Sequence, residues 1–253
     1  TTNHGCADTV TKQVPVFPVP KVGFTLANVC YADSAVFTDT STIDSTQILK
    51  YLWAYGDGQT DSTQHPKYLY PYADTFVVTH TAISDMGCKN DASDSIVIYP
   101  RPLAKVQTAN VCKGDTVLLT DLTQPTTDTL VQRQWWEGVY FIDTNQVQKW
   151  LPADTGLHTI LLWVENNFGC TDTQTAVVDV YSNPVAAYTI GDICYIDTAI
   201  FIDVSTIDEG YIDKRLWAFG DGSGAFNTTK PPKKYSVAGT YKTQLMTISE
   251  KGC

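Results

Sequence analysis

The residues of this 253-residue chain that are best placed to do chemistry are its seven cysteines. They form two series, each repeating at steps of 82 or 83 residues. The first series, in which each cysteine follows a glycine, is Cys6, Cys88, Cys170 and Cys253, and the second series is Cys30, Cys112 and Cys194. Thiols at regular spacing either bind a metal or form disulfides. Because the chain has no Cys-x-x-Cys motif and its four histidines do not repeat, the pattern indicates structural disulfides and an oxidising, extracellular or cell-surface setting.

Catalytic chemistry has little support in the sequence. There is no Gly-x-Ser-x-Gly, no His-Glu-x-x-His and no phosphate-binding loop, so we predict neither enzyme activity nor a metal site. Asp57 and Asp221, with the acidic residues around them, are the best candidates for Ca²⁺, which takes six to eight oxygen ligands. No EF-hand-like spacing accompanies them, and the middle repeat lacks the aspartate. We therefore expect both to stabilise turns, and we predict no cofactor.

A tryptophan-centred segment repeats with the cysteines. It reads Trp53-Ala54-Tyr55-Gly56-Asp57-Gly58 and, later, Trp217-Ala218-Phe219-Gly220-Asp221-Gly222. Trp135 lies midway between the two tryptophans but is followed by Trp136-Glu137-Gly138. Alternating aromatic residues share one face of a strand, and the glycines then allow a tight reversal. The simplest interpretation of this signature is a core strand that ends in a turn, with no chemistry of its own.

Composition narrows the class of protein. The formal net charge is −10 and the sequence pI is about 4.7, which argues against binding to nucleic acid or to an anionic membrane surface. No apolar run approaches the roughly 20 residues that span a bilayer, so no transmembrane segment is predicted. Thr, Asp, Val and Tyr are abundant and helix-period patterns are absent, which is typical of an all-β protein.

The Trp-x-(Tyr/Phe)-Gly-Asp-Gly signature resembles that of PKD domains, which are extracellular, immunoglobulin-like β-sandwiches. The family continues with His-x-Tyr, a turn and Gly-x-Tyr-x-Val, and the corresponding segments here are 70–78 and 235–241. Two departures are present: the family's first Asp is Ala54 or Ala218 in this chain, and the turn of the middle repeat is remodelled. The resemblance implies an all-β chain of tandem immunoglobulin-like (PKD) sandwiches, arranged head to tail.

The period and the proline-containing borders divide the chain. We expect residues 1–19 to be the last strand of a preceding PKD-like domain, 20–101 a PKD-like domain, 102–183 a divergent PKD-like domain, and 184–253 a PKD-like domain that lacks its last strand. In the first complete domain, strands are expected near 21–27, 35–40, 49–55, 75–83 and 94–99, with further strands between 60 and 72. The corner after the first strand is expected at 28–33, and the corner before the last strand at Gly87-Cys88.

In a seven-stranded sandwich of this type, these two corners lie at opposite ends. Cys30 and Cys88 should then be some 30 Å apart, which is too far for a disulfide. The pairs that a head-to-tail stack of domains brings together are Cys30–Cys170 and Cys112–Cys253, with Cys6, Cys88 and Cys194 pairing outside the fragment. The alternative is a Cys30–Cys88 staple within one domain, which would leave the domains as beads on proline-containing linkers.

Asp-Thr or Asp-Ser before a small or aliphatic residue recurs along the chain and resembles the O-glycosylation sequon of secreted Bacteroidota proteins. The candidate acceptors are Thr9, Ser34, Ser95, Thr116, Thr129 and Thr198. The same dipeptide is also common where a strand begins after a turn, so a purely structural role is the alternative.

Together these features resemble the multi-PKD adhesins and gliding-associated surface proteins of Bacteroidota. We expect an extracellular or cell-surface segment that forms a stiff stalk or fibre, with disulfide-clamped domain junctions. Its partners would be neighbouring domains of the same long chain, with a homopolymer or a bundled fibre as a further option, and no nucleic acid. Because PKD domains also accompany secreted hydrolases, the alternative is a polymer- or carbohydrate-binding accessory module of such an enzyme.

Overall fold

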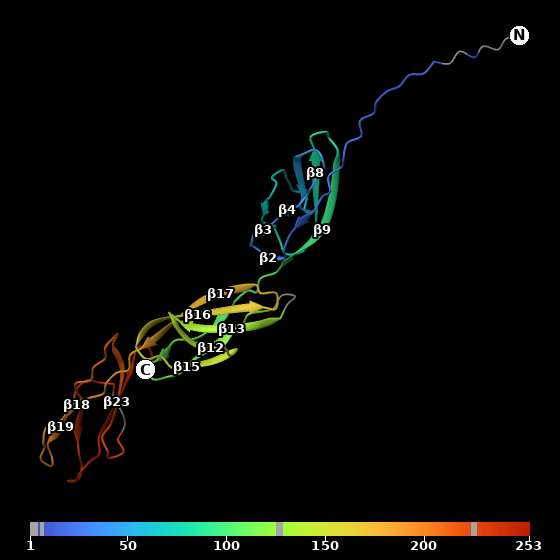
Figure 1. Ribbon diagram of the computed structural model, residues 1–253. Helices are drawn as coiled ribbons and strands as arrows, with labels where there is room; N and C mark the ends of the chain where they lie inside the picture. The colour runs from blue at the N-terminus through green and yellow to red at the C-terminus, as the bar shows by residue number, and fades with distance from the viewer. Residues whose placement is uncertain (1–4, 6–7, 125–128, 224–226) are drawn as a thin grey trace. The chain divides into compact units, whose positions relative to one another are not determined.

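The computed structural model describes residue 5 and residues 8–124, 129–223 and 227–253. Within these ranges the chain is all-β and contains no helix. It falls into two compact units. Unit 1 consists of Thr1–Arg101 and Phe168–Cys170, and unit 2 consists of Pro102–Asn167 and Thr171–Cys253. The strands form tandem immunoglobulin-like sandwiches, one in unit 1 and two in unit 2 (Figure 1).

The first sandwich is built from strands of unit 1. They are β1 (Phe24–Thr25), β2 (Val29–Cys30), β3 (Ala35–Val36), β4 (Thr38–Asp39), β5 (Ile48–Ala54), β6 (Thr60–Asp61), β7 (Lys67–Tyr68), β8 (Thr75–Ser84) and β9 (Lys89–Tyr99). The main sheet has the order β2-β9-β8-β5-β6, and the short pairs β1-β4 and β3-β7 complete the sandwich. The long strands β8 and β9 run antiparallel, while β2 joins β9 in parallel.

Alternating burial explains why these segments form strands with one face in the core. In β8 the side chains of Phe76, Val78, His80 and Ala82 are buried, and the residues between them are more exposed. Successive side chains of a strand point to opposite faces, so this pattern places one face of β8 against the second layer. The core of the first sandwich consists of Ala35, Phe37, Trp53, Tyr55, Tyr70, Phe76, Val78, Ile96 and Ile98.

The second and third sandwiches both belong to unit 2. The second contains β10 (Val106–Gln107), β11 (Val111–Cys112), β12 (Val117–Asp121), β13 (Leu130–Glu137), β14 (Tyr140–Asp143), β15 (Val147–Trp150), β16 (Gly156–Asn166) and β17 (Thr171–Tyr181). Its sheets have the orders β11-β17-β16-β13-β14 and β10-β12-β15. The third contains β18 (Tyr188–Thr189), β19 (Thr198–Ile200), β20 (Ile202–Asp203), β21 (Ile212–Ala218), β22 (Pro232–Lys234) and β23 (Gln244–Ser249), in the pairs β18-β20, β19-β22 and β21-β23.

The observed strands differ from the expected ones in several places. β1 covers only part of 21–27, and β9 begins at Lys89 rather than near 94. Residues 28–33, expected to be only a corner, contain β2, because the backbone of Val29 and Cys30 pairs with the end of β9. The expected strand 35–40 divides into β3 and β4, which pair with different strands. Residues 1–19 are expected to be the last strand of a preceding domain, and the described residues 8–19 of that segment are not in a strand. The domain boundaries given above stay a prediction.

Candidate functional site

The two cysteine-bearing corners of the first sandwich lie at opposite ends of its last strand. Cys30 pairs with Tyr99, the final residue of β9, whereas Cys88 immediately precedes Lys89, the first residue of β9. β9 has 11 residues, which corresponds to a separation of roughly 33 Å. A disulfide needs Cα atoms within about 7 Å, so the geometry disfavours a Cys30–Cys88 bond within this sandwich.

Among the described cysteines there are two disulfides, and each joins cysteines of different repeats. Cys30 is bonded to Cys170 and Cys112 to Cys253, with a Cα–Cα distance of 5.6 Å in both. The bonded residues are 140 and 141 positions apart, so each bond links the second series in one repeat to the first series in the next. Within the described ranges Cys88 and Cys194 are free, and Cys6 lies outside the described residues.

Glycine-dependent turns present Cys88 and Cys253 of the first series. The N–H of Ser84 donates to the carbonyl of Cys88 at 2.8 Å, and the N–H of Cys88 donates to Ser84 Oγ at 3.1 Å. Ser249 and Cys253 make the same two bonds, at 2.8 and 3.1 Å. Gly87 has a φ of 79°, a left-handed value that glycine adopts without steric cost. The Gly-Cys dipeptide therefore fixes where the thiol emerges from the hairpin.

Backbone and side-chain hydrogen bonds hold the corners of the second series. At each corner, the aspartate three residues after the cysteine donates its N–H to the cysteine carbonyl, at 2.9, 3.0 and 3.1 Å in chain order. Asn28 accepts a bond from the N–H of Val97 at 2.8 Å and donates to the hydroxyl of Tyr99 at 3.1 Å. Asn110 makes the matching bonds in the second sandwich, at 2.9 and 2.8 Å. These side chains fasten the corner to the last strand of its own sandwich.

The residue two positions before each bonded first-series cysteine packs on a tyrosine. Phe168 stacks on Tyr99, with ring centroids 4.2 Å apart and the planes 5° from parallel. Lys251 places its ammonium group 5.6 Å from the centroid of Tyr181. Stacking and cation–π contacts of this kind add about 0.5–1.5 kcal/mol each. Non-covalent contacts therefore accompany both disulfides.

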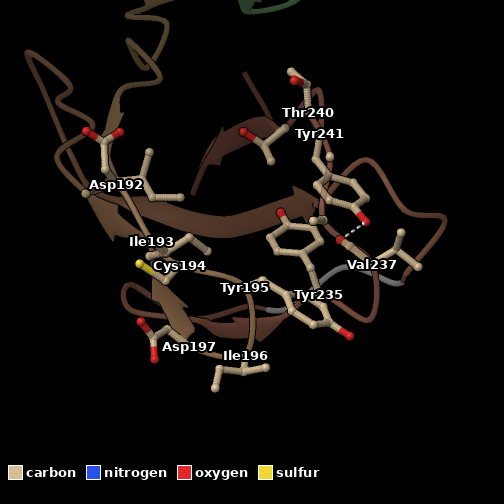
Figure 2. Close-up of a pocket in the computed structure, with 15 residues that line it drawn as sticks. Asp192, Ile193, Cys194, Tyr195, Ile196, Asp197, Tyr235, Val237, Thr240 and Tyr241 are labelled. Atoms are coloured by element: carbon tan, nitrogen blue, oxygen red, sulfur yellow. Dashed lines mark hydrogen bonds between the residues drawn. The ribbon is translucent and has the colours of Figure 1, made fainter.

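The third corner, at Cys194, borders a hollow of about 420 Å³ (Figure 2). Tyr195, Tyr235 and Tyr241 line it. Tyr195 and Tyr241 donate from their hydroxyls to the carbonyls of residues 236 and 237, at 3.1 and 2.8 Å, so the tyrosines are held in place. The thiol of Cys194 is exposed. This end of the third sandwich therefore offers an accessible sulfhydryl beside an aromatic hollow.

The signature tryptophans are core residues. Trp53, Trp135 and Trp217 are at most 1% exposed. Each donates its indole N–H to a backbone carbonyl 10 or 11 residues later, at 2.9, 2.8 and 2.9 Å. Gly56 has a φ of 88°, and a Cβ built there would lie 2.6 Å from the carbonyl oxygen of Val77. Gly56 is therefore required both by its backbone conformation and by the close approach of β8.

The signature aspartates hold turns. Asp57 accepts a hydrogen bond from the hydroxyl of Tyr68 at 2.6 Å. Asp221 lies 2.6 Å from the Nζ of Lys233, and hydrogen bonds from Lys233 and Ser223 lower the pKa of Asp221 to about 2. In the ranges that the structure describes, no group of three or more His, Cys, Asp or Glu side chains could hold a metal ion. The carboxylates of Asp57 and Asp221, which a cation would need as ligands, already accept hydrogen bonds from groups of the protein.

A buried polar site that the sequence reasoning missed recurs in all three sandwiches. Its aspartates, at steps of 82 residues, are Asp39, Asp121 and Asp203, with side chains at most 3% exposed. Asp121 pairs with Arg133 at 2.9 Å, and Asp203 pairs with Arg215. The first repeat has Tyr51 at the arginine position, and there Asp39 bonds to the fully buried His80 at 3.0 Å. The regular spacing of the three aspartates was the signal that could have revealed this site.

Hydrogen bonding favours the ionised form of Asp39 and of Asp203. Burial by itself would raise the pKa of Asp39, but hydrogen bonds from Ser41, Gln64 and His80 outweigh that effect, so the pKa is lowered. The pKa of Asp203 is lowered in the same way, because bonds from Ser205 and Arg215 outweigh burial. The buried carboxylates of Asp39 and Asp203 are thus matched by hydrogen-bond donors, as buried polar groups usually are.

The candidate glycosylation residues are distributed over the three repeats and the segment before them, which holds Thr9. Thr9, Ser34, Ser95, Thr116 and Thr129 are exposed, and Thr198 is half-buried. Exposure makes the first five accessible to a modifying enzyme, and no two of the six lie next to each other in the sequence.

Comparison with known proteins supports a PKD-type domain in the first part of the chain. The family model for the PKD domain matches residues 16–98. A search of curated proteins finds no match. Within the described ranges, no helix has the length and hydropathy needed to cross a membrane.

Similar solved structures include two PKD1 domains. That of Vibrio anguillarum Epp is 23% identical, with 32% of this chain and 95% of that chain covered and a TM-score of 0.31. That of the Vibrio cholerae metalloprotease PrtV is 26% identical, with 33% and 99% covered and a TM-score of 0.29. The titin domains I67–I69 match over 93% of this chain and 89% of that chain, at 14% identity and a TM-score of 0.42.

Proposed function

We propose that the chain is a structural segment of a longer surface protein, in which disulfides tie successive PKD-like domains into a stiff stalk or fibre. The domains would be 20–101, 102–183 and 184–253, with residues 1–19 belonging to a preceding one. The observation that carries the proposal is the pairing of cysteines 140 and 141 residues apart, across repeat borders. PKD-type and immunoglobulin-like domains are typically non-catalytic modules, and such domains and disulfides are typical of extracellular proteins.

The mechanical argument follows from the number of connections at each border. A peptide linker alone leaves neighbouring domains free to swing, because interdomain interfaces are usually small. A disulfide from Cys30 to Cys170 adds a second covalent connection at the first border, and Cys112 to Cys253 adds one at the second. Two separated connections restrict bending and twisting, which a surface stalk requires. We further propose that the chain comes from an adhesin of the Bacteroidota type. In such a protein, the exposed Asp-Thr and Asp-Ser acceptors would carry hexose.

The test is peptide mapping by mass spectrometry, without reduction, on material purified from its natural source. Linked peptides containing Cys30–Cys170 and Cys112–Cys253 are expected, and both should disappear from a reduced control. Hexose on the Thr9, Ser34 or Thr116 peptides would support the surface assignment. Linked peptides containing Cys30–Cys88 would refute the clamped stalk and would leave independent, internally stapled domains.

A further inference from the structure

The main sheet of the second sandwich carries two tryptophans that its siblings lack. In this sheet Trp136 of β13 lies opposite Leu161 of β16, and Gln134 lies opposite Trp163. The same four register positions, in the same order, are Ala54, Thr79, Leu52 and Thr81 in the first sandwich and Ala218, Gln244, Leu216 and Met246 in the third. Because both siblings form the same strand pair without these indoles, the fold does not require them.

Both tryptophans lie on the outer face of this sheet. Their neighbours along the strands, Trp135 and Leu162, are fully buried in the core. Since successive side chains of a strand point to opposite faces, Trp136 and Trp163 point away from the core, and both are only half-buried. The register makes them diagonal neighbours on adjacent strands, which places them roughly 7–8 Å apart. One ligand can therefore contact both indoles.

A shallow hollow of about 430 Å³ lies on this face. Its lining consists of Gln134, Trp136, Gly138, Val139, Leu161 and Trp163. The indole N–H of Trp136 donates to Gln134 Oε1 at 3.3 Å. The ring of Phe141, in the edge strand β14, packs edge-on against Trp136 with centroids 5.3 Å apart and planes at 70°. These two contacts orient the Trp136 ring within the hollow.

The polar groups of this face are uncharged amides and hydroxyls. None of the six residues that line the hollow carries a charge. On β17, the exposed Thr173 lies opposite Trp163. In the first sandwich the same position is Asp91, opposite Thr81. The second sandwich thus replaces a carboxylate by a hydroxyl where it gains an indole. A few neutral polar groups among aromatic side chains are typical of a site for a neutral small molecule.

We propose that this outer face of the second sandwich binds a neutral polysaccharide built from glucose-type pyranose rings. The hydroxyls of such a ring are equatorial, so its two faces expose C–H groups and its rim carries the hydroxyls. The C–H faces stack on Trp136 and Trp163, and the rim hydroxyls bond to Gln134 and Thr173. This ligand matches the alternation of indole with amide and hydroxyl groups.

Other classes of ligand fit this face less well. An apolar protein surface would cover the amide of Gln134 and the hydroxyl of Thr173 without replacing their hydrogen bonds to water, which costs free energy. An acidic polysaccharide would be repelled by a chain of formal net charge −10. The neutral lining and the acidic chain together favour the neutral sugar.

The shallow hollow and its two stacking contacts set the expected affinity. A short oligosaccharide should bind weakly, with a dissociation constant of roughly 0.1–1 mM. A long polysaccharide that meets many copies of the face at a surface would be held more tightly by avidity. This inference goes beyond the proposed stalk and does not depend on it.

The test is native gel electrophoresis of the 253-residue chain in gels containing hydroxyethylcellulose, together with calorimetric titration of cellohexaose. Retardation in the gel and a measurable heat of binding are expected. Trp136→Ala and Trp163→Thr introduce the residues that the first sandwich has at these positions, so the variants should fold. Each should weaken cellohexaose binding by about tenfold, and the double variant should migrate as in a gel without polysaccharide. Leu52→Ala, on the corresponding face of the first sandwich, should change neither measurement.

Four outcomes would overturn the inference. The first is an absence of both retardation and heat with cellohexaose at about 5 mM. The second is undiminished binding by a double variant whose circular dichroism and melting temperature match the parent. The third is equal retardation by dextran sulfate, which would mean that the face does not select neutral sugar. The fourth is self-association that the double variant loses, without any sugar binding, which would assign the face to a second copy. None of these results alters the mapped disulfides, so the stalk is tested separately.

Discussion

The two disulfides overlap in sequence, and this gives a mechanical prediction. Cys112 lies inside the loop that Cys30–Cys170 closes, and Cys170 lies inside the loop that Cys112–Cys253 closes. If the chain is pulled from residues 1 and 253, tension follows the shortest covalent path. That path runs from residue 1 to Cys30, crosses to Cys170, returns along the chain to Cys112 and crosses to Cys253. The rest of the chain carries no tension.

The length hidden from the force can be worked out from the residue numbers. The shortest path contains about 87 residues, so about 165 of the 253 lie outside it. At roughly 3.3–3.6 Å per extended residue, and after allowing for the two bridges, the fully stretched chain should be about 55 nm shorter oxidised than reduced. Removing one bond leaves a path of about 112 residues, which restores only about 8 nm of the stretched length. Removing both disulfides restores the full length of the stretched chain.

The assay is single-molecule force spectroscopy of the chain tethered at its two ends, with and without a reductant. Cys30→Ser and Cys112→Ser should each lengthen the stretched, oxidised chain by the small increment, and the double variant should match the reduced chain. Cys194→Ser is the matched control and should change nothing. A single variant that recovered half or more of the hidden length would show that the bonds do not overlap, and the reasoning would fail.

Two further predictions concern stability. Gly56→Ala should destabilise the first sandwich by about 3–5 kcal/mol, because it adds a clash with β8 to a left-handed backbone cost, whereas Gly58→Ala, at φ 94° with open space, should cost only about 1–2 kcal/mol. Hydrogen exchange of the β5 and β8 amides measures both, and equal effects would contradict the close-approach argument. The pKa of Asp39 is lower in the folded protein than its value of about 3.9 in the unfolded chain. The stability that Asp39 contributes is therefore complete above the unfolded-state pKa, and it is lost as the pH falls through the folded-state pKa. The melting temperature should therefore drop below about pH 4, with a smaller drop in Asp39→Asn; identical drops would exclude Asp39 as a cause.

Much of the fold could be read from the sequence because its signals are local and repeated. The alternation around Trp53 and the Gly-Asp-Gly turn specify strand and reversal from neighbouring residues alone. Because the same strands and turns recur every 82 residues, one topological argument about the two corners applies to each repeat and leads to both cysteine pairs. Where the repeat is broken, as after Trp135, the local signal changes too.

The sequence by itself determined the all-β class, the repeat and the cysteine series, because strand periodicity and turn chemistry depend on residues close together in the chain. Only the tertiary structure decided which distant groups meet. It pairs β2 with the end of β9 and gives Asp39 a histidine where the other repeats use arginine. It also leaves β14 as an exposed edge. These outcomes depend on which strands become neighbours across a sheet, and that is set by packing of the whole sandwich.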